Sequence, residues 1–254
     1  MNVNLLAISI GNTRTRFGTF VDGELVETAL AMNGEPSQII EMACQGIDPL
    51  RCKSQSAVLL ASVNPTLCEE VERKLAGELK RKLMRVERDL PIPVGRQLDP
   101  ETLVGDDRLL NAAAAYHVLK QACVVIDAGT AITVDFVDGA GTFHGGAIAP
   151  GTRMMLDSLS RHTAQLPEVE MARPEELIGH NTAQAMLGGV FYGVRGMARE
   201  LAERYAEFAG LYPVVVATGG DADMLFNGFE LVERVVPDLT LIGMAVTLES
   251  ALQR

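Results

Sequence analysis

Two short segments of this chain share one pattern of residue types, and it is a pattern that binds phosphate. The first, ISIGNT, spans residues 8–13, and the second, IDAGT, spans residues 126–130. In each, a glycine lets the backbone approach a ligand closely, while Asn or Thr side chains add hydrogen-bond donors without bulk. A single copy is more often an ordinary turn, where these residues are common. Two copies facing one another would hold a chain of phosphates, and the repetition favours that interpretation.

The two copies differ at the residue that opens the turn, which is Ser9 in the first and Asp127 in the second. Asp127 ends an apolar run, where a carboxylate can hold a cation that bridges nucleotide phosphates. Capping of its own turn is the alternative role for Asp127, and the two roles are compatible. Ser9 brings no charge, so the predicted phosphate clamp is charged on one side only.

A third candidate segment is Gly-Asp-Asp-Arg at residues 105–108, which opens a predicted helix over 107–119. Either Asp106 or Asp107 could simply cap the helix, since acidic side chains are favoured at a helix N-terminus. Arg108 opposes the helix dipole, and a residue that breaks a local rule is a candidate for function. An Asp that accepts a proton, beside an Arg that orients an anion, suits phosphoryl transfer to a hydroxyl group.

The elements that must position these segments occur twice in the same order. Each copy predicts a strand, the turn and a second strand that ends in an Asp-Gly hairpin turn, at residues 22–23 and 138–139. Strands followed by helices, twice, predict an α/β fold of two similar halves, 1–120 and 121–254, around a cleft. Residues 139–151, rich in glycine, are interpreted as a wall for a ligand. The predicted helices lie near 36–44, 65–79, 107–119, 153–163, 181–208 and 240–251, with a short helix from 222 and strands at 57–62, 123–126 and 213–218.

The composition of the chain favours a globular protein over a nucleic-acid-binding or membrane protein. The 254 residues are 48% apolar, which predicts a well-packed globular protein, and the net charge of −11 argues against nucleic-acid binding. The apolar run near the N-terminus is too short to span a membrane and has no basic region of a signal peptide. Neither the cysteines nor the scattered histidines have metal-ligand spacing. We expect the cysteines to be reduced thiols and the protein to be cytoplasmic. The cysteines are Cys44, Cys52, Cys68 and Cys123.

Taken together, these segments resemble the type III pantothenate kinases, a family that also contains the Bvg accessory factor proteins. The resemblance covers nearly the whole chain, and many motifs match in order. They are ISIGNT (8–13), ASVNP (61–65), GDDRLLNA (105–112), DAGT (127–130), GGAIAPG (145–151), IGHNT (178–182), FYG (191–193), ATGG (217–220) and PDLTL (237–241).

The resemblance implies a duplicated actin-like fold, related to that of ribonuclease H, and a homodimer. It implies ATP-dependent phosphorylation of pantothenate to 4′-phosphopantothenate, the first step of coenzyme A biosynthesis. The implied cofactors are Mg²⁺ with ATP and a monovalent cation, K⁺ or NH₄⁺. Asp127 would hold the monovalent cation. No membrane or nucleic-acid partner is implied.

The resemblance also implies a role for each motif residue. Asp107 would be the general base toward the pantothenate hydroxyl, in a pocket lined by residues 105–108, and Thr182 would contact pantothenate from the other subunit. The pocket residues are Gly105, Asp106, Asp107 and Arg108. The ATP-binding residues are Ser9, Ile10, Gly11, Asn12, Thr13, Arg14, Thr15, Arg16, Gly129 and Thr130.

The chain departs from the family pattern in two places. Ser9 stands where the family has Asp, and residues 96–100 contain no Tyr, which the family has shortly before its Gly-x-Asp-Arg motif. These departures leave two alternatives open: a kinase for a different hydroxyl acceptor, and a catalytically weak nucleotide-binding accessory protein. In addition, Asp106 is expected to raise the pKa of Asp107 if the two carboxylates face the same way.

Overall fold

The computed structural model describes residues 3–53, 55–79 and 81–253, and it divides the chain into two compact units. The first unit comprises Met1–Val94, Asp99–Val118 and Leu239–Arg254, and the second comprises Gly95–Leu98 and Leu119–Asp238. The predicted boundary at residues 120–121 lies close to one of the crossings between units. The units differ from the predicted halves mainly in the last helix, which packs in the first unit rather than the second.

The first unit is built on a five-stranded sheet with the order β3-β2-β1-β4-β5. Central strand β1 is antiparallel to β2 and parallel to β4. The strands are β1 (Asn4–Ile10), β2 (Arg14–Val21), β3 (Glu24–Met32), β4 (Ser56–Ser62) and β5 (Leu83–Arg85).

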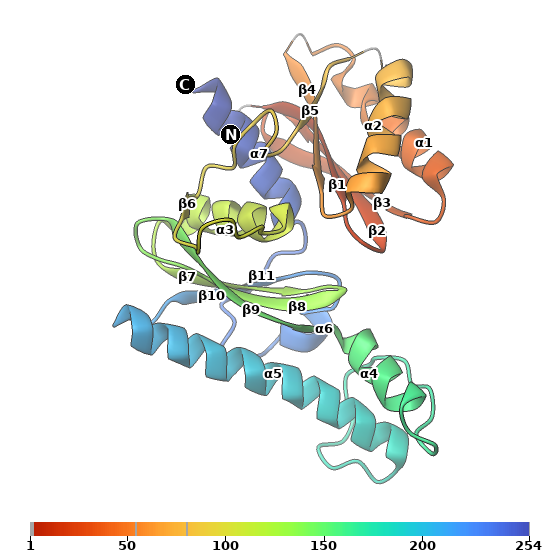
Figure 1. Ribbon diagram of the computed structural model, residues 1–254, viewed down its shortest axis with the longest axis vertical. Coiled ribbons are helices and arrows are strands. Elements are labelled where there is room, and N and C mark those ends of the chain that lie inside the picture. The colour runs from red at the N-terminus through yellow and green to blue at the C-terminus, as the bar shows by residue number, and fades with distance from the viewer. Residues whose placement is uncertain (1–2, 54, 80, 254) are drawn as a thin grey trace. The chain divides into compact units, whose positions relative to one another are not determined.

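Helices cover both faces of this sheet (Figure 1). On one face α1 (Pro36–Gly46), η1 (Asp48–Leu50) and α2 (Pro65–Leu79) enclose an apolar core with alternate side chains of β1 and β4. On the other face lies α7 (Leu239–Leu252), where Leu241 contacts Gly18 of β2, and α3 (Asp106–Leu119) packs against α7. The α2 start is specified locally, because the Asn64 side chain accepts a hydrogen bond from the Leu67 amide and Pro65 follows it.

The second unit is built on a six-stranded sheet with the order β11-β10-β7-β8-β9-β6. Its strands are β6 (Gly95–Arg96), β7 (Cys123–Ala128), β8 (Ala131–Val137), β9 (Thr142–Pro150), β10 (Val214–Thr218) and β11 (Arg234–Val235). One apolar core joins this sheet to α4 (Thr152–Arg161), α5 (Thr182–Ala209) and α6 (Ala222–Phe226). The long α5 runs along that face (Figure 1).

The two sheets repeat one topology. The order β3-β2-β1-β4-β5 in the first unit corresponds to β9-β8-β7-β10-β11 in the second, and β6 extends the second sheet beyond β9. In both, the strand that opens the phosphate motif is antiparallel to the next strand and parallel to a later one. The predicted α/β fold with an internal duplication is therefore confirmed.

The hairpin prediction is confirmed in one copy and wrong in the other. Asp22 and Gly23 have φ angles of 51° and 87°, as a two-residue hairpin turn requires. The Asp138 carboxylate instead accepts hydrogen bonds from the amides of Ala140 and Thr142, both at 2.9 Å, and positive φ falls on Gly141. Because the side chain caps the backbone, this loop extends over residues 138–141.

The glycine-rich segment, interpreted from its sequence as a wall for a ligand, forms a strand that was not predicted. Residues 142–150 form β9, which pairs with β8. A Cβ at Gly146 would lie 2.0 Å from the Val134 carbonyl oxygen, so only glycine allows this close pairing.

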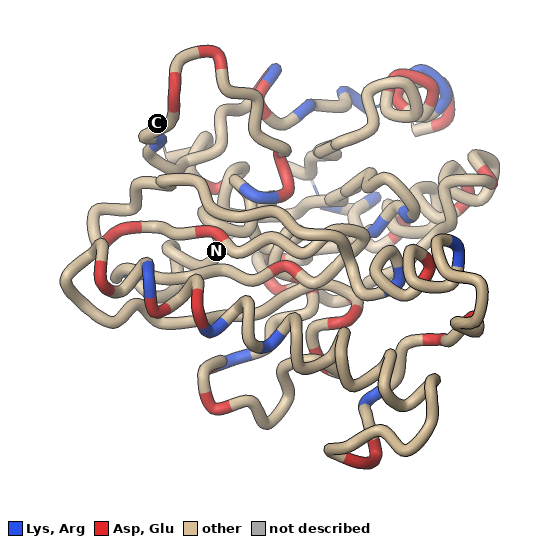
Figure 2. The backbone as a smooth tube through the Cα atoms, turned by 60° about the horizontal axis from the view of Figure 1, so that its bottom comes forward, with Lys and Arg blue, Asp and Glu red and all other residues tan. Residues whose placement is uncertain are grey.

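The helices and the charged residues each have one property that bears on function. Within the described residues, no helix combines the length and apolar character needed to cross a membrane. Lys and Arg are interspersed with Asp and Glu along the backbone (Figure 2). The local charge at each candidate site therefore depends on a few individual residues.

Candidate active site

The first phosphate-type loop joins β1 to β2 and is held by a side chain from the end of β3. The Gly11 amide donates to the Arg14 carbonyl at 3.0 Å, which closes the turn. The Asn33 side chain donates to the Gly11 carbonyl and accepts from the Thr15 hydroxyl, both at 2.8 Å. Asn33 thus fixes both ends of the loop. Sequence reasoning missed it, because only the sheet brings residue 33 beside residue 11.

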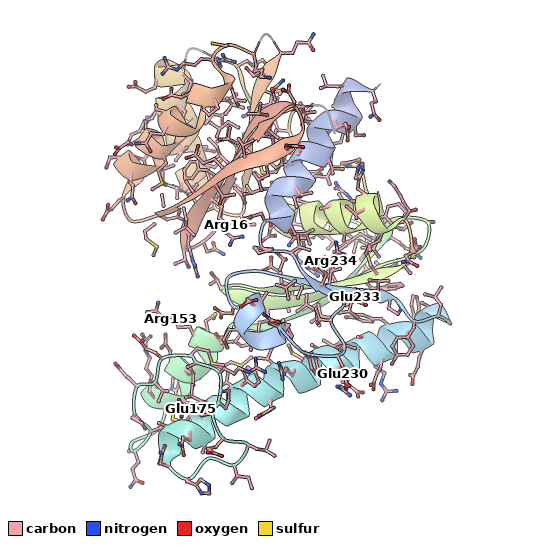
Figure 3. All side chains as sticks on the ribbon, turned by 180° about the vertical axis from the view of Figure 1, so that it is seen from behind. Arg16, Arg153, Glu175, Glu230, Glu233 and Arg234 are labelled. Atoms are coloured by element: carbon pink, nitrogen blue, oxygen red, sulfur yellow. The ribbon has the colours of Figure 1, made fainter. Side chains whose placement is uncertain are left out.

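The predicted residues of this loop divide by burial. Ile10 and Thr15 are buried, and they serve the core and the Asn33 hydrogen bond. Asn12, Thr13 and Arg14 are exposed at the tip, where their backbone and side chains can reach a ligand. Ser9 and Arg16 are half-buried and lie directly opposite each other on β1 and β2; Figure 3 labels Arg16.

The second loop joins β7 to β8 and is packed between turns from elsewhere in the same unit. The Gly129 amide donates to the Ala131 carbonyl at 3.0 Å, so this loop is closed like the first but is one residue shorter. On one side the Gly151 amide donates to the Thr130 carbonyl at 3.1 Å. On the other side Gly219, with φ of 100°, lies so close that a Cβ there would be 2.5 Å from Asp127 Oδ1.

The Asp127 carboxylate therefore lies in surroundings that glycine keeps open. It is half-buried at the end of β7, opposite Thr133 on β8 and Thr218 on β10. The sequence placed Asp127 correctly at a strand end, but Gly219 as its neighbour and Gly151 as the neighbour of Thr130 were missed. The available signal was the Gly219-Gly220 pair directly after a β-branched run.

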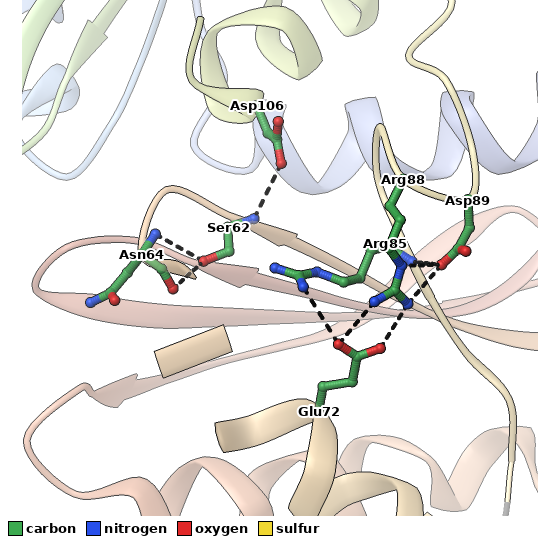
Figure 4. Close-up of polar contacts among 7 residues, drawn as sticks. All are labelled: Ser62, Asn64, Glu72, Arg85, Arg88, Asp89 and Asp106. Carbon is green, nitrogen blue, oxygen red and sulfur yellow. Dashed lines mark hydrogen bonds and ion pairs between the residues drawn. The ribbon is translucent and has the colours of Figure 1, made fainter. Parts of the chain in front are cut away.

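The Gly-Asp-Asp-Arg segment forms the start of α3, at the ends of the central strands of the first unit. Asp106 Oδ2 accepts from the Ser62 amide at a long 3.5 Å (Figure 4). Ser62 pairs with Ile10, and the next amide, Val63, donates to the Ile10 carbonyl at 3.1 Å. The structure therefore brings residues 105–108 beside the strand that leads into the first loop.

Asp107 is the more buried of the two carboxylates, and its neighbours are local. Its Oδ1 accepts from the Arg108 amide at 2.8 Å. A Cβ at residue 105 would lie 2.6 Å from the same oxygen, so Gly105 makes room for the carboxylate.

Burial raises the pKa of the Asp107 carboxyl above its usual value, and the amide and positive charge of Arg108 oppose the shift. Burial is also the main cause of the raised pKa of Asp106, followed by the opposing Ser62 hydrogen bond and the charges of Glu87 and Asp107. Desolvation, rather than charge repulsion from Asp106, thus explains the raised pKa of Asp107. A carboxylate with a raised pKa is better matched to accepting a proton near neutral pH.

An ion cluster lies below this segment and connects α2 to β5. Arg88 Nη2 contacts Glu72 at 2.7 Å and Asp89 at 2.9 Å, and Arg85 Nη1 lies 3.6 Å from Glu72 (Figure 4). Its members are partly exposed, so it contributes modestly to stability. We assign it a structural role.

Thr182 is the first residue of α5. The helix start is capped, because Asn181 accepts from the Gln184 amide and Gln184 accepts from the His180 amide, both at 2.9 Å. Thr182 lines an apolar groove of about 630 Å³ between α4 and α5, with Met154, Met155, Leu159, Met186 and Val190 among the other lining residues.

The donor sets suit ions that are shared with a ligand. Within the described residues, no group of three or more His, Cys, Asp or Glu side chains could hold a metal ion by itself. In the second unit, Asp127 offers one carboxylate in an open setting. Mg²⁺ fits such a donor, since it is commonly held by one or two carboxylates together with substrate phosphates. In the first unit, Ser9 offers a hydroxyl group.

Comparison with known proteins assigns this chain to a family. The family model of the type III pantothenate kinases matches residues 5–204. A type III pantothenate kinase from Dehalococcoides mccartyi is 34% identical over 97% of this chain and 97% of its own length. Another from an Anaeromyxobacter species is 35% identical over 96% and 98%.

Solved structures agree on the fold. A Campylobacter jejuni protein assigned to the Baf family of transcriptional activators matches with a TM-score of 0.66 at 21% identity, over 98% of this chain and 100% of its own. A Sinorhizobium meliloti protein assigned as a 2-dehydro-3-deoxygalactonokinase matches with a TM-score of 0.56 at 14% identity, over 98% of each chain, and the present chain has the duplicated actin-like fold.

Proposed function

This chain belongs to the type III pantothenate kinase family, and we propose on that premise that it transfers the γ-phosphoryl group of ATP to the hydroxyl group of pantothenate. The products are ADP and 4′-phosphopantothenate, and the reaction is the first step of coenzyme A biosynthesis. The observation that carries the chemistry is the half-buried Asp107 with a raised pKa, next to Arg108, at the strand ends that lead into a phosphate-type loop.

Asp107 is the proposed general base. Its carboxylate takes the proton of the pantothenate hydroxyl as that oxygen bonds to the γ-phosphorus, and the bond from the γ-phosphorus to the bridging oxygen breaks to release ADP. Arg108 orients the pantothenate carboxylate, because guanidinium groups bind carboxylates with two parallel hydrogen bonds. Gly105 and Asp106 line the same pocket.

Each phosphate-type loop is proposed to bind phosphate groups of ATP. The exposed tip of the first loop, at Asn12, Thr13 and Arg14, offers amides and side chains, and Arg16 adds positive charge. Gly129 and Thr130 offer their backbone in the second loop. Fixed donors of this kind stabilise the charge on a transferring phosphoryl group.

Asp127 is the proposed cation ligand. Its carboxylate can hold Mg²⁺ together with ATP phosphates, or the monovalent K⁺ or NH₄⁺ that the resemblance implies. A bound cation would neutralise charge on the phosphates. Assays with and without K⁺, at fixed MgATP, measure which cation the protein uses.

We further propose a homodimer formed through α5, to which Thr182 contributes. At four glycines of this helix, Gly188, Gly189, Gly193 and Gly196, an added Cβ would meet no described atom within 4 Å apart from adjacent residues and the nearby backbone of the helix itself. Glycine inside a helix costs about 1 kcal/mol relative to Ala, so its repeated use favours close approach of another backbone. Gly193→Leu is expected to give monomers by light scattering. Gly77→Leu, on α2 and equally open, is the matched control and should leave the oligomeric state unchanged.

The proposed location is the cytoplasm, where ATP is supplied. The described structure leaves all four cysteines as free thiols, which suits a reducing compartment.

Replacement of Asp107 by Asn tests the proposed chemistry. Loss of a general base should lower kcat for pantothenate by about 10²–10⁴-fold and leave MgATP binding nearly unchanged. Asp48→Asn removes an exposed carboxylate of the same unit and is the matched control. A kcat for Asp107→Asn within threefold of wild type would remove Asp107 from the mechanism.

The acceptor is tested separately with wild type. A panel of small alcohols in an ATP-consumption assay should give pantothenate the highest kcat/KM by a wide margin. A better acceptor in that panel would contradict the proposed substrate while leaving the kinase chemistry intact.

A further inference from the structure

Three turns of the second unit meet at one end of its sheet. Strands β7 and β10 are parallel neighbours with Asp127 opposite Thr218, and β9 ends at Pro150 opposite Ala131 on β8. The loop after β7, the turn after β10 and the start of α4 therefore emerge together. The first of these is the phosphate-type loop that contains Gly129 and Thr130.

The turn after β10 is attached to the loop through its backbone. The Asp221 amide donates to the Ala128 carbonyl at 3.0 Å, directly before Gly129. A Cβ at Gly219 would lie 2.4 Å from the same carbonyl oxygen, so this turn and the loop are in close backbone contact.

The start of α4 is attached to the other end of the loop. The Gly151 amide donates to the Thr130 carbonyl at 3.1 Å, and a Cβ at Gly151 would lie 2.3 Å from that oxygen. The next residue, Thr152, is 1% exposed. Arg153 follows it, with a side chain that is 90% exposed (Figure 3), so the helix start points Thr152 inward.

One side-chain hydrogen bond joins these two supports. The buried Thr152 hydroxyl donates to Asp221 Oδ2 at 2.6 Å, across 69 residues of sequence. Three hydrogen bonds and one peptide bond thus form a closed ring of contacts. They link Ala128 to Asp221, Asp221 to Thr152, Thr152 to its neighbour Gly151, and Gly151 to Thr130. The segment from Ala128 to Thr130, which contains Gly129, completes this ring.

We propose that Asp221 and Thr152 are positioning residues, which fix the loop of residues 127–130 so that its backbone and the Asp127 carboxylate are preorganised for nucleotide phosphates. The proposal rests on the proposed function only in that this loop binds ATP. A short hydrogen bond from a buried hydroxyl to a carboxylate is of the stronger, charge-assisted type. It is well suited to hold two backbone turns at a fixed separation.

A role in helix capping alone would have a different consequence. A carboxylate near the N-terminus of α4 stabilises the helix through its dipole, and loss of that effect lowers stability only. A positioning role also predicts a change in affinity for nucleotide. Measuring MgATP affinity and stability side by side separates the two.

The test is calorimetry with MgATP, and with a non-hydrolysable ATP analogue and Mg²⁺, on Thr152→Val. Valine keeps the shape and removes the hydroxyl, so we expect Kd to rise by about tenfold, the equivalent of one charged hydrogen bond. Thr152→Ser restores the hydroxyl and should bring Kd back to within about twofold of wild type. Asp221→Asn keeps an acceptor oxygen without the charge and should give an intermediate Kd.

Thr19→Val is the matched control. Thr19 is 2% exposed, and its hydroxyl donates to the Gly46 carbonyl at 2.9 Å, away from any predicted site residue. It should lower the melting temperature and leave the Kd for MgATP unchanged.

Each outcome separates the two proposals. A Kd for folded Thr152→Val within twofold of wild type, or an equal loss in Thr19→Val, overturns the positioning role. Wild type that binds MgATP but phosphorylates no pantothenate overturns the proposed substrate alone. Wild type that binds no MgATP overturns both.

Discussion

The two phosphate-type loops share a topology and differ in charge. In the first, Ser9 on β1 lies opposite Arg16 on β2; in the second, Asp127 on β7 lies opposite Thr133 on β8. The equivalent pair of residues therefore contains one cationic side chain in the first copy, Arg16, and one anionic side chain in the second, Asp127. Cross-strand neighbours lie on the same face and within reach of one another. Under the proposed function, the first loop would attract phosphate and the second would hold a cation.

The loops also differ in what supports them. Asn33 holds the first through its side-chain amide, whereas the second is enclosed by backbone turns that Asp221 and Thr152 connect. The Asn33 support comes from the same three-stranded meander, and the Asp221 support comes from about 90 residues further along the chain. Duplication thus preserved the strands and the glycines, and each copy has its own means of fixing them.

Exchanging residues between the two loops is expected to change kcat/KM for MgATP the most. Asp127→Ser removes the proposed cation ligand, worth several kcal/mol of charge stabilisation, so kcat/KM for MgATP should fall by about 10²-fold or more. Ser9→Asp should give no gain, because the new carboxylate would pair with Arg16 and cancel its charge. Steady-state kinetics at varied MgATP measure both variants. A large gain in Ser9→Asp would show that the first loop lacks a metal ligand it needs.

Removing the support of the first loop should have a smaller effect. Asn33→Ala leaves the Gly11 carbonyl and the Thr15 hydroxyl without their partner, which costs about 1–3 kcal/mol, so KM for MgATP should rise about tenfold with kcat little changed. Asn227→Ala, which breaks an exposed bond to Asp223 within the α6 turn, is the matched control. Equal KM values for the two variants would show that Asn33 supports the fold but not the loop.

The pH profile should show the smallest and most specific effect. Burial holds the pKa of Asp107 above 3.8, and the base must be ionised to act, so kcat/KM should fall as pH drops through a value above 3.8. Asp106→Asn should move this acidic limb by less than about half a pH unit, since desolvation is the largest cause. A limb that moves by a full unit would make Asp106 the dominant influence.

The same shift has a sign for stability. A buried carboxyl with a raised pKa binds its proton more tightly in the folded state. The free energy of unfolding therefore decreases as pH rises from 3.8 through the pKa of the folded state. Ionised Asp107 is thus destabilising at neutral pH, as is common where a site is built for function.

Local signals predicted much of this fold. The Asp22-Gly23 turn, the Pro65 start of α2 and the apolar strand into Asp127 each depend on nearby residues only, and each is confirmed. The prediction of a two-residue turn at Asp138-Gly139 was wrong because the Asp138 side chain caps backbone amides instead. The strand β9 was missed because its glycines, which weaken strand propensity, serve close pairing with β8.

Residue type and spacing were enough to predict the duplicated topology, the glycine turns and the identity of the carboxylates. The surroundings of these residues follow only from the folded structure. The raised pKa of Asp107 comes from burial, the support of Gly11 from Asn33, and that of Gly129 from Asp221 and Thr152. These effects arise between residues that the fold brings together, and Ser9 and Asp127 acquire different neighbours, Arg16 and Thr133, only once the strands pair.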